Sequence, residues 1–88
     1  MKLTAAIRRR SRASSFAIPE LKKYWLIDVR HVGSAIKYFR ENKQRYPVAM
    51  RKAAGDWIAL AYLKFHYRFL TARERAALVP STRKALTI

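Results

Sequence analysis

The chain has no cysteine, two glycines, three prolines and only five acidic residues among its 88. Without cysteine, neither a disulfide framework nor a thiolate metal site can form. The scarcity of glycine and proline leaves few positions that interrupt a helix, and the frequent alanine, leucine, lysine and arginine residues favour helices. No β-rich alternating stretch with hairpin turns is present. The sequence therefore predicts a single, small, all-α domain.

Catalytic motifs are also missing. The two histidines, His31 and His66, fall on different predicted helices, and neither belongs to a set of residues at a metal-ligand spacing. The chain contains no Ser-His-Asp order, no glycine-rich phosphate loop and no nucleotide motif. We therefore expect a protein with no enzymatic activity, no cofactor and no bound metal.

The composition combines two properties that seldom occur together. Twenty Lys and Arg residues give a formal net charge of +15, yet 51% of the residues are hydrophobic and 12% are aromatic. Chains with such an excess of charge are usually poor in aromatic residues. The charge predicts an anionic partner, and the apolar content predicts packing against a dry surface. Two environments offer both: an anionic membrane with protein at its surface, or ribosomal RNA with protein neighbours.

Residues 1–18 form the predicted basic arm of the chain. The first fifteen residues are rich in arginine and serine and contain no acid, which is typical of a mitochondrial presequence. We expect an extended arm that stays on the chain, either for targeting or anchoring or for binding RNA or lipid phosphates. If the partner is RNA, the contacts would come from Arg8, Arg9, Arg10 and Arg12.

The next segment, 19–79, is predicted to be a helical hairpin or a bent pair of helices. Pro19 and Glu20 are typical of a helix start, and Pro47 disfavours helical geometry at Tyr46. We therefore expect two long amphipathic helices joined near Tyr46-Pro47. Spacings of three and four residues define the apolar stripe of the first helix: Leu21, Trp25, Val29, Val32, Ile36 and Phe39.

The second helix is apolar almost all round between Ala53 and Leu63, with Asp56 as the exception. Such a helix is buried in protein or in lipid. A simple membrane span needs about 20 apolar residues, and extension to that length includes basic residues whose long side chains would have to reach one interface. A span therefore stays open as an alternative. We expect Asp56 to pair with Lys52 or with a partner chain.

The C-terminal part is predicted to be a short helix followed by an irregular tail. Thr71 and Glu74 have the spacing of a capping box, in which each side chain bonds the other residue's backbone N–H. The helix would run from Ala72 to about Val79 and stop before Pro80. Residues 80–88 would then be irregular.

Two sets of side chains are candidate contacts. Tyr and Trp have an apolar body and a polar tip, which suits membrane and protein interfaces, and Lys64 and Arg68 would share a helix face. The candidate contacts to lipid or phosphate are Arg51, Lys52, Lys64 and Arg68. The candidate protein interface consists of Trp25, Val29, Val32, Ile36, Phe39, Trp57 and Phe65.

One set of residues along about 20–75 has a layout shared with a known family. The set consists of Trp25, Leu26, Arg30, Gly33, Phe39 and Tyr46, then 57–70 and the basic residues Arg68, Arg73 and Arg75. This layout resembles subunit f of mitochondrial ATP synthase. The resemblance implies a small structural subunit of a mitochondrial inner-membrane complex (ATP synthase or the respiratory chain) that contacts larger subunits and anionic lipid such as cardiolipin. The chain departs from that pattern at Lys64, His66 and Arg68, which interrupt the region that would span the membrane.

The alternative expectation is a mitochondrial ribosomal protein. In that case the arginine arm would neutralise phosphates of ribosomal RNA, and the helices would contact ribosomal proteins. Both expectations place the protein in the mitochondrion, at the inner membrane or its matrix face in the first case.

Overall fold

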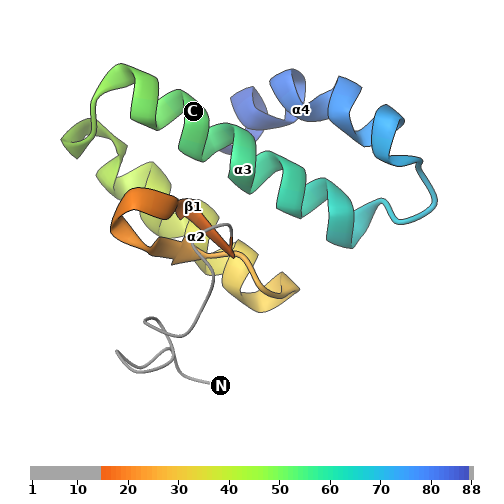
Figure 1. The fold of residues 1–88 in the computed structure, drawn as a ribbon, viewed down its shortest axis with the longest axis horizontal. Helices are drawn as coiled ribbons and strands as arrows, with labels where there is room; N and C mark the ends of the chain where they lie inside the picture. The colour runs from red at the N-terminus through yellow and green to blue at the C-terminus, as the bar shows by residue number, and fades with distance from the viewer. Residues whose placement is uncertain (1–14, 88) are drawn as a thin grey trace.

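The computed structural model describes residues 15–87, which form three α-helices and a small antiparallel hairpin (Figure 1). The helices are α2 (Val29–Asn42), α3 (Val48–His66) and α4 (Ala72–Thr87). Helix α3 crosses the middle of the molecule. Helix α4 lies along one side of it, and the hairpin and α2 lie on the other. The mostly helical character is confirmed, but the hairpin adds a strand element that the sequence pattern does not predict.

The hairpin replaces the first half of the first predicted helix. Strand β1 (Phe16–Ile18) pairs with β2 (Lys23–Trp25), with Phe16 opposite Trp25, and the turn between them is the short 3-10 helix η2 (Pro19–Leu21). Pro19 does begin a helical turn, but Lys22 adopts the left-handed conformation and ends it. The predicted continuous helix from Pro19 is therefore wrong, and the end of the predicted arm, 16–18, is a strand.

Burial explains why the chain turns back here. All three residues of β1 are buried, and Trp25 is only 4% exposed. A continuous helix from Pro19 would have left β1 without a neighbouring strand to satisfy its backbone groups. The reversal requires positive φ angles at Lys22 and at Tyr24, a conformation that non-glycine residues seldom adopt. Burial of the apolar residues of β1 compensates for that local strain.

Helix α2 begins with its own cap. The Asp28 carboxylate accepts a hydrogen bond from the His31 backbone N–H at 2.8 Å, which satisfies one of the unpaired donors of the first turn. The helix ends at Asn42 and passes into the 3-10 helix η3 (Lys43–Arg45). Pro47 then caps α3. The predicted break between two helices near Tyr46-Pro47 is thus confirmed.

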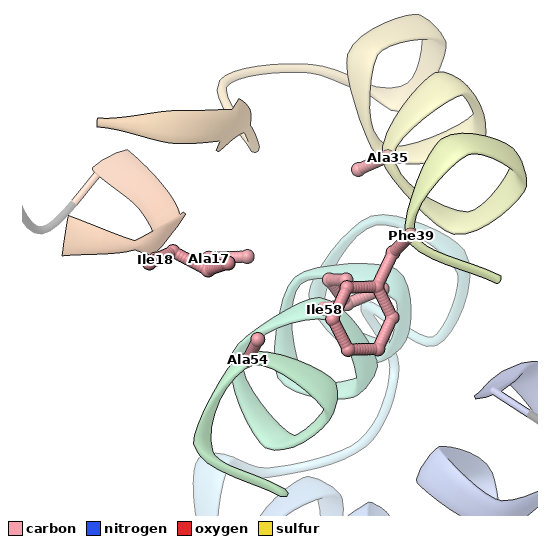
Figure 2. Packing of buried hydrophobic residues seen from close by; sticks show 6 residues of the cluster. All are labelled: Ala17, Ile18, Ala35, Phe39, Ala54 and Ile58. Atoms are coloured by element: carbon pink, nitrogen blue, oxygen red, sulfur yellow. The ribbon is translucent and has the colours of Figure 1, made fainter. Parts of the chain in front are cut away.

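The core lies where β1, α2 and α3 meet. Figure 2 shows Ala17 and Ile18 of β1 facing α3, and Phe39 of α2 lying against Ile58 of α3. Phe39 and Ile58 are almost completely excluded from solvent. Tyr24 and Tyr46 close one side of this core, since the Tyr24 ring stands edge-on to Phe39 at 5.6 Å and the Tyr46 ring stacks on Phe39 at 6.4 Å.

The capping box at the start of α4 is confirmed. The Glu74 backbone N–H donates to Thr71 Oγ1 at 3.1 Å, and the Thr71 N–H donates to Glu74 Oε1 at 2.9 Å. The predicted stop before Pro80 and the irregular tail over 80–87 are wrong, because α4 continues to Thr87 with Pro80 inside it. Val79 and Leu86 are half-buried on either side of this proline. We attribute the longer helix to packing on α3, which offsets the backbone hydrogen bond that proline removes.

Polar contacts also join α4 to the rest of the chain. Arg83 donates to Asp56 of α3 at 2.9 Å, so the partner of Asp56 is Arg83 and not the predicted Lys52. Lys43 of η3 donates to the Thr87 carbonyl. Gly55 is buried directly beneath α4, where an added Cβ would come within 2.9 Å of Arg83 Cγ. The missing side chain at Gly55 therefore allows the two helices to approach each other closely.

Candidate functional site

The structure divides the predicted interface residues into two groups. Trp25, Val32 and Phe39 are buried within the chain's own core. They are therefore not available to a partner in this fold, which corrects their assignment to an interface. The helical spacing that singled them out marks any buried face, whether another part of the chain or another protein covers it. The remaining four stay accessible: Val29 and Trp57 are exposed, and Ile36 and Phe65 are half-buried.

Trp57 is the most informative of the accessible residues. Its side chain is 42% exposed on the face of α3 that α4 leaves open. One depression of about 310 Å³ lies between Trp57 and the segment after β2. A second, of about 410 Å³, lies between Trp57 and the turn of the hairpin. Trp57 is the residue that lines both, so the two depressions lie on either side of its side chain, and together we call them the Trp57 groove.

The groove is apolar along its length and charged at its ends. Ala53, Trp57 and Leu60 of α3 form its floor, at the spacings of three and four residues that keep side chains on one helix face. Ile27, 48% exposed, lies on its wall. Lys64 lines the end near the carboxyl terminus of α3, and Glu20 lines the other end. The remaining lining residues are Ser15, Ala17, Ile18, Pro19, Leu26, Pro47, Ala49, Met50, Ala61 and Phe65.

The four predicted phosphate contacts do not form a single cluster. Lys52 and Lys64 are exposed on α3, but twelve residues separate them, which is about 18 Å along a helix. Arg51 is half-buried and donates to Gln44 Oε1 at 3.3 Å. Helix α3 ends at His66, so Arg68 lies in the turn before α4 and does not share a helix face with Lys64. Of the four, only Lys64 lines the Trp57 groove.

Positive charge is distributed over every helix and the hairpin. Within residues 15–87, eight exposed basic side chains make no hydrogen bond or ion pair with the rest of the chain. Unpaired surface cations of this kind retain their full attraction for an external anion. The eight are Lys23, Arg30, Arg45, Lys52, Lys64, Arg68, Arg73 and Lys84, of which the sequence predicted Lys52, Lys64 and Arg68 as phosphate contacts. The predicted RNA contacts Arg8, Arg9, Arg10 and Arg12 lie outside the described residues.

A third depression, separate from the groove, lies between the hairpin and α2. It measures about 310 Å³, and we call it the His31 depression. The His31 ring lies 4.8 Å from the Trp25 ring, and His31 Nδ1 lies 2.8 Å from Asp28 Oδ1. The hydrogen bonds from His31, first from its backbone N–H and then from its ring, lower the pKa of Asp28. The residues that line the His31 depression are Lys23, Tyr24, Trp25, His31, Ser34, Ala35 and Tyr38.

Tyr24 and Tyr46 form a pair that joins the hairpin to the α2–α3 junction. Their hydroxyl oxygens are 3.0 Å apart. Burial, followed by the hydrogen bond with Tyr46, raises the pKa of Tyr24 well above the ordinary value for tyrosine. Because the Tyr24 hydroxyl stays protonated throughout the physiological range, its role is structural: its hydrogen bond with Tyr46 ties the hairpin to the α2–α3 junction. It supplies no group that could act as an acid or a base near neutral pH.

Among residues 15–87, no group of three or more His, Asp or Glu side chains is close enough to hold a metal ion. In the same part of the chain, no helix has both the length and the apolar character needed to cross a membrane. The most distinctive surfaces of the described residues are the Trp57 groove and the His31 depression, in which polar side chains lie beside aromatic rings, and both have exposed cations nearby. Comparison with protein families, curated proteins and solved structures finds no match to this chain.

Proposed function

We propose that the protein is a non-catalytic accessory subunit that binds a larger protein through the Trp57 groove and meets an anionic surface with its exposed cations. The observation that carries this proposal is the exposure of Trp57 between two adjoining, largely apolar depressions. A large aromatic side chain at the centre of a concave apolar surface is typical of the residues that dominate the energy of a protein interface.

The proposed occupant of the groove is an amphipathic helix of the larger subunit, with acidic residues near one end. The apolar floor follows α3 over several turns, a length that suits a helix lying in a groove. Lys64 lies at one end, and the chain as a whole carries a net charge of +15. Acidic residues on the partner helix would pair with Lys64 and would offset part of the positive charge of this chain.

The proposed setting is an inner-membrane complex of the mitochondrion, where cardiolipin supplies the anionic surface. The arginine- and serine-rich first fifteen residues and the resemblance to subunit f of ATP synthase support this setting. Each basic residue near an anionic membrane surface contributes about 1 kcal/mol to attachment. Several of the exposed cations acting together would give firm peripheral binding.

A vesicle assay tests the lipid half of the proposal. We expect the full chain to co-sediment with vesicles that contain cardiolipin and not with vesicles of neutral lipid alone. Lys64→Glu combined with Lys52→Glu should reduce the bound fraction, since two charges on α3 are reversed. Equal binding to neutral and cardiolipin vesicles would contradict a role for lipid phosphate.

The groove half is tested separately. Trp57→Ala should abolish recovery of the protein with its intact complex from isolated mitochondrial membranes. Leu78→Ala is the matched control, because Leu78 is also about 40% exposed but lies on α4 outside the groove. If the two variants are recovered equally well, the groove is not the docking surface.

A mitochondrial ribosomal protein is the second candidate. The observation in its favour is that the exposed cations are spread over β2, η3 and all three α-helices and are not confined to one element. RNA can enclose a small protein and neutralise charges in several directions, whereas a flat membrane meets one side. Replacing Arg8, Arg9, Arg10 and Arg12 by Gln should then abolish co-sedimentation with ribosomes. If that variant loses RNA association and no form of the protein attaches to membranes, the ribosomal role replaces our leading proposal.

A further inference from the structure

We propose that the His31 depression binds a phosphate group, at a site separate from the Trp57 groove. Three polar residues of different chemistry line it from two elements: Lys23 from β2, and His31 and Ser34 from α2. Within residues 15–87, Lys23 and Ser34 make no other side-chain hydrogen bond or ion pair. Both are therefore available to a ligand.

Trp25 supplies an independent observation at the same place. Its ring is 4% exposed and lines the depression, and its Nε1 atom has no hydrogen-bond partner within the described residues. A buried donor without a partner is costly, and such groups are uncommon in folded proteins. The ring of His31 lies next to it at 4.8 Å. Because Nε1 itself is excluded from solvent and the two rings are in contact, a ligand oxygen would reach this donor, and supply the acceptor that Trp25 lacks, only when the His31 ring turns aside.

Asp28 determines how His31 can serve a ligand. The His31 Nδ1–H donates to the Asp28 carboxylate, so Nε2 is the ring atom that stays available. Once the imidazole is protonated, Nε2 becomes a donor as well. The second hydrogen bond to Asp28, from the His31 backbone, holds the carboxylate in place. Asp28 therefore orients the ring and compensates the charge that His31 gains.

The donor set favours phosphate over a carboxylate. A carboxylate offers two oxygens, whereas a terminal phosphate offers three, enough for Lys23, His31 and Ser34 to be satisfied together. Tyr38, at the edge of the depression, provides an exposed aromatic wall, and the Lys37 ammonium group lies 5.5 Å from the centre of its ring. The site therefore suits a phosphate that is attached to a less polar body. That phosphate could belong to a lipid head group or to a free phosphate ester.

The two tryptophans provide an internal control for the test. The full-length ¹⁵N-labelled chain is titrated with inorganic phosphate and with glycerol 3-phosphate, with chloride adjusted to keep the ionic strength constant. We expect the indole N–H signal of Trp25 to shift and saturate, while that of Trp57, on another face, stays in place. Equal shifts of both signals, or no saturation at Trp25, would overturn the proposal.

Variants then test the donors individually. Lys23→Gln and Ser34→Ala should each weaken binding, the first by about tenfold because it removes a charged hydrogen-bond donor. Lys84→Gln removes the same charge from α4, outside the depression, and should leave the affinity unchanged. If Lys84→Gln weakens binding as much as Lys23→Gln, the ligand responds to net charge only and the site is refuted.

Vesicles identify the source of the phosphate. If cardiolipin vesicles shift the Trp25 signal and glycerol 3-phosphate competes with them, the ligand is a lipid head group. A shift with the soluble esters alone assigns the site to a free phosphate ester. A shift with RNA oligonucleotides alone would overturn both assignments. None of these results depends on the Trp57 groove, so the phosphate site and the docking proposal can fail independently.

Discussion

The hairpin with α2 and the C-terminal helix α4 lie on opposite sides of α3, but they are attached to it in different ways. The first region contributes buried side chains, among them Phe16, Ile18 and Phe39. Helix α4 contributes none over its whole described length. Half-buried side chains, an ion pair, an end contact from Lys43 and the close approach at Gly55 hold it instead. Full burial of side chains thus stabilises the hairpin and α2 on one side of α3. Partial burial, the close approach at Gly55 and polar contacts hold α4 on the other side.

The difference concerns cooperativity as much as strength. A buried aromatic cluster unfolds as a unit, because loss of one ring exposes its neighbours. A helix held by half-buried residues and polar contacts can detach at a smaller free-energy cost than global unfolding requires. We therefore expect α4 to be the first element to lose structure. Four tests, taken in order of expected effect, examine this view.

Phe39→Ala should have the largest effect. Phe39 is 1% exposed and contacts both the Tyr24 and Tyr46 rings. Truncation of a buried phenylalanine costs about 3–5 kcal/mol, a large part of the stability of a domain this small. Urea denaturation followed by circular dichroism measures the loss. If the free energy of unfolding falls by less than about 1 kcal/mol, the cluster around Phe39 is not what makes this side of the molecule the more stable one.

Gly55→Val should have the next largest effect and should act on α4. A Cβ at Gly55 meets Arg83 Cγ at 2.9 Å, so the Arg83 side chain must shift or α4 must move away, and overpacking of this kind costs about 1–3 kcal/mol. Hydrogen exchange should become faster in α4 and stay unchanged in α2.

Gly33→Ala is the control for that substitution, because no atom lies within 4 Å of the Cβ it would add. It should stabilise α2 by about 1 kcal/mol through helix propensity alone. If both glycine substitutions destabilise the protein equally, the close approach of α4 is not what distinguishes Gly55.

The ion pair between Asp56 and Arg83 should contribute less. Both side chains are partly exposed, so we expect a coupling energy of about 0.5–1 kcal/mol. A double-mutant cycle with Asp56→Ala and Arg83→Ala measures it. The coupling should fall in high salt, because solvent ions screen exposed pairs. A coupling near zero at low salt would leave Gly55 and the half-buried residues as the main determinants of the position of α4.

Acid should have the smallest effect, confined to the start of α4. The hydrogen bond from the Thr71 backbone N–H, followed by that of its side chain, lowers the pKa of Glu74. Because the pKa is lower in the folded state, the cap contributes fully above the ordinary carboxyl value and is lost as the pH falls through the folded value. NMR titration should show the first turn of α4 fraying in that window below about pH 4.5. In Glu74→Gln the window should disappear, and fraying that persists there would assign the effect to another group.

The break at Tyr46-Pro47 and the capping box at Thr71 could be predicted because both depend on neighbouring residues only. Proline restricts the residue before it, and Thr71 and Glu74 meet within one helical turn. The surplus of cations is likewise a property of composition. The accessible candidates Trp57 and Lys64 were identified from local pattern, although the groove that contains them was not.

Contacts between distant segments decided the rest. The spacing of Trp25, Val32 and Phe39 indicates a face that will be covered, but only the folded chain shows that its own hairpin and α3 cover it. The stop expected at Pro80 gives way because Val79 and Leu86 pack on α3, and Asp56 pairs with Arg83, 27 residues away, in preference to Lys52. The sequence by itself determined the turns, the caps and the charge, because these depend on residues a few positions apart. Which apolar faces stay open, and which donors converge beside Trp25, was decided by tertiary packing, since burial depends on what the whole chain brings together.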